Sequence, residues 1–175
     1  MVAVMQNRFL QKKFANGCGI PTTDFRLARN HRELVAAHRA LGFPGVLKLQ
    51  FGGPEAEGPW VVRDFDDVPR ALQETKGRPL LWERFVDIDA EFTVFAERKQ
   101  DGTVDTDPQP RIGDRDLGDR ARAETAMLGE RLGIVGAYHV RFFQSAGQLL
   151  FDELVIDTPG NKEASPSSSM SCAGP

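Results

Sequence analysis

Apolar residues recur at helical spacing in the first part of the chain, where two segments each predict a helix. Residues 7–15 fit a helix that Asn7 can cap. Residues 30–41 fit a second helix, because Asn30 and Glu33 stand three positions apart, as in a capping box. The sequence therefore predicts a helical beginning.

Farther along the chain, apolar and polar residues alternate, which is typical of strands. In the segment 46–51, three apolar residues share one face, whereas Lys48 and Gln50 share the other. Turn-forming residues fill the segment 52–59, and a second apolar run follows at 60–63. We therefore expect a hairpin with a long connecting loop.

Helical spacing and strand alternation also predict the remaining elements, and the order of all the elements predicts the fold class. In chain order these elements are a helix at 67–75, strands at 80–86 and 91–98, an irregular stretch at 105–118, a helix at 119–132, and strands at 137–144 and 148–156. The order indicates an α+β fold of two lobes, in which a small β-β-α-β subdomain packs on a larger mixed sheet with helices. Ligands tend to bind between such lobes.

The expected domain organisation follows from these elements. It comprises an N-terminal helical part at 1–45, the smaller lobe at 46–86, the larger lobe at 87–158 and a tail at 159–175. The last segment is rich in serine and has almost nothing to bury, so we expect it to be disordered.

Composition and charge exclude several classes of partner. The 175 residues are 41% hydrophobic and 27% charged, and the net charge is −3, which argues against nucleic-acid binding. No apolar run approaches the length of a membrane span, and no signal segment is recognised, so we expect a cytoplasmic protein that does not bind membranes. Cys18 and Cys172 lack metal-ligand spacing and are expected to be reduced thiols.

Lys48 and the glycines that follow it are the first candidates for chemistry. A lysine on a strand that enters the Gly52 and Gly53 turn can place a point charge on a phosphate. Spacing alone favours the alternative, a solvated lysine on a half-exposed strand. Together with Gly58 the loop could cover phosphates, but it does not match the phosphate-loop pattern.

Two carboxylates in the middle of the chain are further candidates. Glu83 is charged within an apolar strand and could accept hydrogen bonds from ribose hydroxyls, or it could lie exposed on an edge strand. Glu91 follows eight residues later. Without a functional role, Glu91 would be a surface carboxylate in a weak ion pair with a nearby arginine or lysine.

Asp152 and Glu153 are adjacent on the last strand, so alternation predicts that they point to opposite faces. Glu153 would then share a face with Leu149 and Phe151, and a carboxylate among apolar neighbours needs a partner. The sequence leaves two candidate partners for Glu153: a Mg²⁺ ion bridged to phosphates, or Arg141 on the preceding strand.

Short motifs in a fixed order give the chain a family resemblance that spans residues 6–156. They are QNRFLQK at 6–12, GIPT at 19–22, LGFP at 41–44, VLK at 46–48, GG at 52–53, WERFV at 82–86, Glu91, LG at 132–133 and DEL at 152–154. In this order they resemble the ATP-grasp region of 5-(carboxyamino)imidazole ribonucleotide synthases.

The resemblance implies an activity and its partners. Enzymes of that family use ATP and bicarbonate to carboxylate aminoimidazole ribonucleotide in purine biosynthesis, by way of carboxyphosphate. For this chain it implies ATP and Mg²⁺ as cofactors and a homodimeric assembly. The residues implied to bind the cofactors are Lys48, Gly52, Gly53, Gly58, Glu83, Arg84, Phe85, Val86, Glu91, Asp152 and Glu153, with Glu153 as the metal ligand.

The chain also departs from the family pattern. Arg141 stands where the family has its other metal-binding carboxylate, and Asp152 stands where it has asparagine. A cation about 4 Å from Mg²⁺ costs on the order of 4 kcal/mol at an effective dielectric constant near 20. The family's flanking domains and a phosphate-binding arginine after Glu153 have no counterpart here, so we expect a truncated and catalytically impaired chain.

Two other hypotheses remain open. The chain could be a non-catalytic module with the ATP-grasp shape, in which Arg141 and Glu153 form an ion pair in place of the metal. It could also be another ATP-grasp ligase, related to biotin carboxylase or to the amino-acid ligases.

Overall fold

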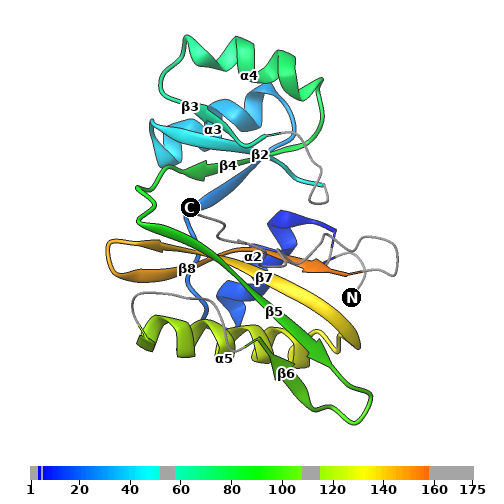
Figure 1. Cartoon of the computed structure of the whole chain (residues 1–175). Helices are drawn as coiled ribbons and strands as arrows, with labels where there is room; N and C mark the ends of the chain where they lie inside the picture. Colours follow the sequence, from blue (N-terminus) through cyan, green and yellow to red (C-terminus); the bar gives the residue numbers. More distant parts are fainter. Residues whose placement is uncertain (1–3, 5, 52–57, 108–114, 158–175) are drawn as a thin grey trace, which may run out of the picture.

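Two four-stranded antiparallel sheets face one another and divide the chain into two lobes (Figure 1). A computed structural model describes residues 4, 6–51, 58–107 and 115–157. Helices α3 and α4 lie on the outer side of the smaller lobe, and α5 lies on the outer side of the larger lobe (Figure 1). The helices are α2 (Arg8–Gly17), α3 (His31–Leu41), α4 (Asp67–Thr75) and α5 (Arg115–Arg131). The two-lobed α+β arrangement expected from the sequence is confirmed.

The smaller lobe is a sheet with the strand order β1-β4-β2-β3. These strands are β1 (Phe25–Ala28), β2 (Gly45–Leu49), β3 (Trp60–Val62) and β4 (Leu80–Arg84). Apolar side chains of β2 and β4 pack against α3 and α4, and Trp82 at the centre of this core is fully buried. Lys48 lies on the other face of β2, as alternation predicts.

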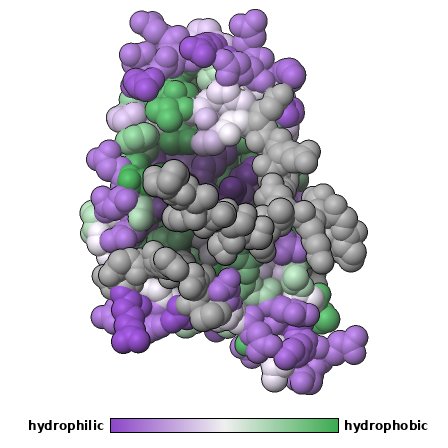
Figure 2. Space-filling model, in the orientation of Figure 1, coloured by the Kyte–Doolittle hydropathy of each residue, from purple (hydrophilic) through white to green (hydrophobic). Residues whose placement is uncertain are grey.

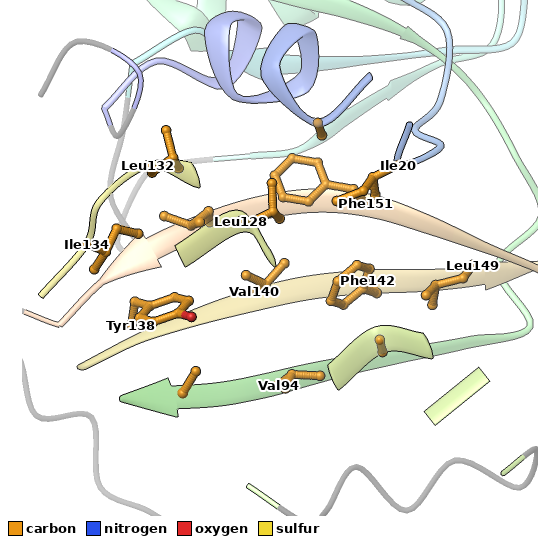
Figure 3. Packing of buried hydrophobic residues seen from close by; sticks show 14 of the residues in the cluster. Ile20, Val94, Leu128, Leu132, Ile134, Tyr138, Val140, Phe142, Leu149 and Phe151 are labelled. Carbon is orange, nitrogen blue, oxygen red and sulfur yellow. The ribbon is translucent and has the colours of Figure 1, made fainter. Parts of the chain in front are cut away.

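The larger lobe is a sheet with the order β6-β5-β7-β8. Its strands are β5 (Ala90–Arg98), β6 (Val104–Thr106), β7 (Gly136–Ser145) and β8 (Gln148–Ile156). One face of this sheet packs against α5, and α2 packs against β8. Figure 3 shows the resulting core, in which Val94, Val140, Phe142 and Phe151 are buried.

Local sequence signals account for the helix starts. Asn7 accepts a hydrogen bond from the Leu10 N–H, and Asn30 accepts one from the Glu33 N–H. The Glu33 carboxylate reaches back to the Arg29 N–H, one residue before the cap. The two cap contacts each satisfy an N–H group that a helix end would otherwise leave unpaired.

The structure adds details that the sequence pattern did not reveal. β1 and α3 precede residue 46, yet β1 pairs with β4, so the sheet of the smaller lobe begins earlier in the chain than the predicted boundary. β6 overlaps the start of the stretch expected to be irregular, and the first turn of α5 lies at its end. We expected a mixed sheet in the larger lobe. Its strands pair antiparallel, and an isolated bridge between Thr22 and Phe151 is the parallel pairing that the described residues show.

Some expectations fall on residues outside the described ranges. These are the placement of Gly52 and Gly53, the disordered tail at 159–175, and Cys172. Within the described ranges, no helix has both the length and the apolar character needed to cross a membrane. Cys18 is a free thiol.

Candidate functional site

A cleft of about 260 Å³ lies between the lobes and is lined by residues from both. Figure 2 shows hydrophilic side chains in the space between the lobes. The segment that joins β4 to β5 forms part of its wall. The lining residues are Arg8, Thr23, Val46, Lys48, Gly58, Pro59, Val61, Glu83, Arg84, Phe85, Val86, Ile88, Glu91, Arg141, Phe143 and Asp152.

Lys48 bridges the lobes at the centre of the cleft. Its Nζ lies 2.5 Å from Asp152 Oδ1 on β8 and 3.5 Å from Glu83 Oε2 on β4. It also lies 5.1 Å from the centroid of the Phe143 ring. Burial lowers the pKa of Lys48, but attraction to Glu83 and Asp152 outweighs burial and raises the pKa above its ordinary value. Lys48, whose side chain is 11% exposed, is therefore a largely enclosed, charged ammonium rather than a solvated surface lysine.

Lys12 of α2 is a second cation beside the cleft, and sequence reasoning did not single it out. It is fully buried, and its Nζ donates to Thr22 Oγ1 (2.7 Å) and Thr23 Oγ1 (3.1 Å). Glu83 Oε2 lies 3.2 Å away and also accepts from Thr23 (2.8 Å). Burial lowers the pKa of Lys12, although Glu83 acts in the opposite direction.

Glu153 lies between two arginines. Its Oε1 is 2.7 Å from Arg8 Nη2, and its Oε2 pairs with Arg141. The Glu153 side chain is 2% exposed, whereas that of Arg141 is 41% exposed. Arg8 also donates to the Leu49 carbonyl (3.3 Å), which ties the start of α2 to the end of β2. Of the two partners that the sequence left open for Glu153, the structure contains the arginine.

A β-bulge changes the way in which the two acidic residues point. Arg141 stands opposite Glu153, but the next residue, Phe142, stands opposite Phe151, so Asp152 is an extra residue in β8. Leu149 and Phe151 before the bulge are in the core, and so is Leu154 after it. The expectation that the acidic pair points to opposite faces, with Glu153 on the face of Leu149 and Phe151, is therefore wrong. Both carboxylates contact cations of the cleft.

The other predicted residues lie around this charged centre. Glu83 is buried, and its Oε1 has no hydrogen-bond partner in the part of the chain that the structure describes. Arg84 is exposed at the rim, where its side chain donates to Asp24 (3.0 Å) and to the Leu41 carbonyl (3.1 Å). Glu91 is exposed at the opposite end of the wall.

Two hydrogen bonds fix the backbone at the start of the segment that joins β4 to β5. The Phe85 N–H donates to the Pro44 carbonyl (3.3 Å), and the Arg84 N–H donates to the Asp24 carbonyl (2.9 Å). Phe85, Val86 and Gly58 all line the cleft, as do Lys48, Glu83, Glu91 and Asp152. Most of the predicted residues that the structure describes therefore meet in one place, although they come from distant segments.

The carboxylates do not provide a site for Mg²⁺. A magnesium ion needs oxygen ligands in near-octahedral geometry. Glu153 is engaged by Arg8 and Arg141, and Asp152 is engaged by Lys48. Among residues 4, 6–51, 58–107 and 115–157, no group of three or more His, Cys, Asp or Glu side chains could hold a metal ion. The residues present fit an ion-paired cluster, not a metal centre.

Comparison with known proteins identifies the fold family. The model of the ATP-grasp domain matches residues 13–116, which is more than half of the chain. The chain belongs to the ATP-grasp family. This ATP-grasp chain is also 34% identical over 99 residues to an N5-carboxyaminoimidazole ribonucleotide synthase of Pseudomonas aeruginosa, a match that covers 57% of the chain and 28% of that relative. A synthase of the same name from Synechococcus elongatus is 26% identical over 172 residues, covering 90% of the chain and 44% of the relative.

Solved structures give the same fold. The ATP-grasp chain matches the crystal structure of an ADP complex of N5-carboxyaminoimidazole ribonucleotide synthetase with a TM-score of 0.79 and 28% identity, over 87% of this chain and 45% of that one. It matches the carboxyaminoimidazole ribonucleotide synthase of Aspergillus clavatus complexed with ATP with a TM-score of 0.73 and 22% identity, over 87% and 45% of the two chains. The ATP-grasp chain thus spans less than half the length of these relatives.

Proposed function

We propose that the cleft between the lobes binds the adenine nucleotide ATP. The observation that carries this proposal is the convergence of Lys48, Glu83 and Asp152, together with the 85–88 wall, on one cleft of an ATP-grasp fold. A largely enclosed ammonium in a concave surface with a few convergent polar groups is typical of a ligand site.

The cleft has groups for each part of such a nucleotide. Lys48, Arg8 and Arg141 are cations that can hold phosphates. Glu91 can accept hydrogen bonds from ribose hydroxyls, and so can Glu83 Oε1, which has no hydrogen-bond partner among the described residues. The backbone of 85–86, next to the apolar side chains of Val46 and Ile88, can bind an adenine ring.

We propose further that this region serves a ligase of the kind that carboxylates aminoimidazole ribonucleotide with ATP and bicarbonate in purine biosynthesis. A solved synthase of that name from Aspergillus clavatus was crystallised with ADP and 5-aminoimidazole ribonucleotide, which supports the acceptor by similarity. Bicarbonate and a homodimeric assembly belong to the same proposal and rest on the family resemblance alone. The residues described here would supply nucleotide binding and exclusion of water from the cleft.

One observation favours a second candidate, a non-catalytic module that binds nucleotide without turning it over. Arg141 pairs with Glu153, where the ligase hypothesis requires a metal-binding carboxylate. Turnover separates the two candidates. Release of phosphate from ATP in the presence of aminoimidazole ribonucleotide and bicarbonate would support the ligase, and ADP binding without phosphate release would support the module.

Binding itself can be tested by isothermal titration calorimetry with ADP, in the wild-type chain and in two matched variants. Glu91→Gln removes a charged acceptor from the cleft wall and should weaken ADP about tenfold, the effect of one hydrogen bond to a charged group. Glu97→Gln changes an exposed carboxylate farther along β5, away from the cleft, and should leave the affinity unchanged.

The competing outcomes are separable. Equal loss of affinity in both variants would show that the effect is not specific to the cleft wall, and a gain in both would show that net charge governs binding. An absence of ADP binding to the wild-type chain would overturn the nucleotide assignment.

A further inference from the structure

We infer that the cleft binds nucleoside polyphosphates without a divalent cation, because Arg141 supplies the positive charge that a metal would otherwise supply. This inference rests on the proposed nucleotide function and specifies how the phosphates are neutralised. The ligand class is a polyphosphate free of metal, such as ADP in the presence of a chelator.

The first step is the balance of charges between the lobes. Four cations lie together: Arg8, Lys12, Lys48 and Arg141. They face three buried carboxylates, those of Glu83, Asp152 and Glu153. Even without Lys12, whose pKa burial lowers, the other three cations match the three carboxylates. The cluster therefore has no unbalanced negative charge that would attract a free divalent cation.

The second step is the lack of free metal ligands. Both oxygens of Glu153 contact arginines, and Asp152 Oδ1 contacts Lys48. A cation that entered here would have to displace guanidinium groups from a carboxylate that is 2% exposed. Within the described ranges no alternative cluster of ligands is present.

The third step is the position of Arg141 itself. Its side chain is 41% exposed and lines the cleft together with Lys48 and Arg8. One terminal nitrogen holds Glu153, and a guanidinium has five N–H donors in a planar fork. The fork geometry of the remaining terminal donors suits phosphate oxygens.

The test is ADP titration by calorimetry in two buffers, one with EDTA and one with excess MgCl₂, at the same ionic strength. We expect binding in EDTA at least as tight as in MgCl₂, because Mg²⁺ would lower the negative charge of the ligand and be repelled by Arg8 and Arg141. Binding that requires MgCl₂ would overturn this inference while leaving the proposed function intact. No binding in either buffer would overturn both.

Variants of Arg141 test whether this residue neutralises the phosphates of ADP. Arg141→Gln should weaken ADP in EDTA about tenfold, and Arg141→Lys should recover only part of the loss, because the charge is retained but the planar fork of donors is not. Arg26→Gln is the matched control, since Arg26 is an exposed strand arginine that does not line the cleft. If Arg141→Gln bound ADP in EDTA as tightly as the wild type, Arg141 would not neutralise the phosphates. The wild-type comparison remains decisive even if a variant is unstable.

Discussion

Arg141 and Glu153 lie opposite one another across the β7–β8 pair, and Arg8 approaches the second oxygen of the same carboxylate from α2. The three side chains thus join one strand pair of the larger lobe to the helix that begins beside β2. Glu153 is the shared member, so its loss breaks both ion pairs, whereas the loss of one arginine breaks only one.

The free energy of unfolding should respond unequally to the loss of each partner. Glu153→Gln leaves two arginines beside a buried neutral group and should destabilise the fold by about 3 kcal/mol, as expected when a buried pair loses one member. Arg141→Gln removes a side chain that is 41% exposed and leaves Arg8 in place, so its cost should be at most about 1 kcal/mol. Urea denaturation measures both values. Equal costs would contradict the shared-carboxylate arrangement.

Asp152→Asn should strengthen nucleotide binding. Asp152 holds the Lys48 ammonium at 2.5 Å, so in the ligand-free protein it competes with any phosphate for that charge. A neutral amide of the same shape removes the competitor, and we expect ADP to bind about tenfold more tightly. Calorimetry checks this prediction, with Asp66→Asn as the control, because Asp66 is exposed and does not line the cleft. Weaker binding in Asp152→Asn would show that the carboxylate helps to hold the ligand.

The free energy of unfolding should fall in acid because Asp152 becomes protonated. Burial raises the pKa of Asp152, but attraction to Lys48 and Lys12 outweighs burial and holds the pKa below its ordinary value of 3.8. As the pH falls through 3.8, the unfolded chain takes up a proton before the native protein does, so the free energy of unfolding decreases until the native pKa is passed. Above pH 3.8 this contribution is fully present.

Urea denaturation between pH 5 and pH 2, about the range in which such carboxylates titrate, measures this slope. Asp152→Asn should flatten it, whereas Asp87→Asn should leave it unchanged, because the Asp87 side chain is exposed. A slope that stays the same in Asp152→Asn would contradict the depressed pKa.

Gly129 in α5 should not tolerate a methyl group. A Cβ at this position would collide with the hydroxyl end of Tyr138, which is fully buried and donates to the Thr125 carbonyl (3.2 Å). Overpacking of this kind costs about 1 to 3 kcal/mol, which exceeds the gain in helix propensity of about 1 kcal/mol from Gly129→Ala. Thermal denaturation should therefore show a lower Tm for Gly129→Ala. Gly17→Ala in α2 is the control: its Cβ would meet nothing within 4 Å, and its Tm should not fall.

The helices and most strands could be predicted because their signals are local. Asn30 and Glu33 act within one turn of α3, and the alternation around Lys48 spans only the five residues of β2. β1 was missed because four residues are too few to show a period, and its pairing with β4 depends on a segment more than fifty residues away. Such pairing is decided by tertiary contact rather than by local propensity.

The candidate site could be predicted only in part, for a related reason. Lys48 and Glu83 stood out as charges within apolar strands, whereas Arg8 and Lys12 look like ordinary polar positions of an amphipathic helix. Their burial results from the way α2 lies beside β4 and β8, which no helical period encodes. The bulge at Asp152 also has no signature in the sequence, so the direction of Glu153 was misjudged.

The extra residue in β8 makes this strand unusually tolerant of one change in length. Before it, Leu149 and Phe151 point inward at odd positions; after it, Leu154 and Ile156 point inward at even ones. Loss of Asp152 would therefore restore a regular alternation and keep the same apolar side chains in the core, whereas an insertion or deletion elsewhere in the strand would turn its end inside out. An ancestor or a descendant of this chain could differ here by a single codon, with a different partner for Lys48 and the same hydrophobic interior.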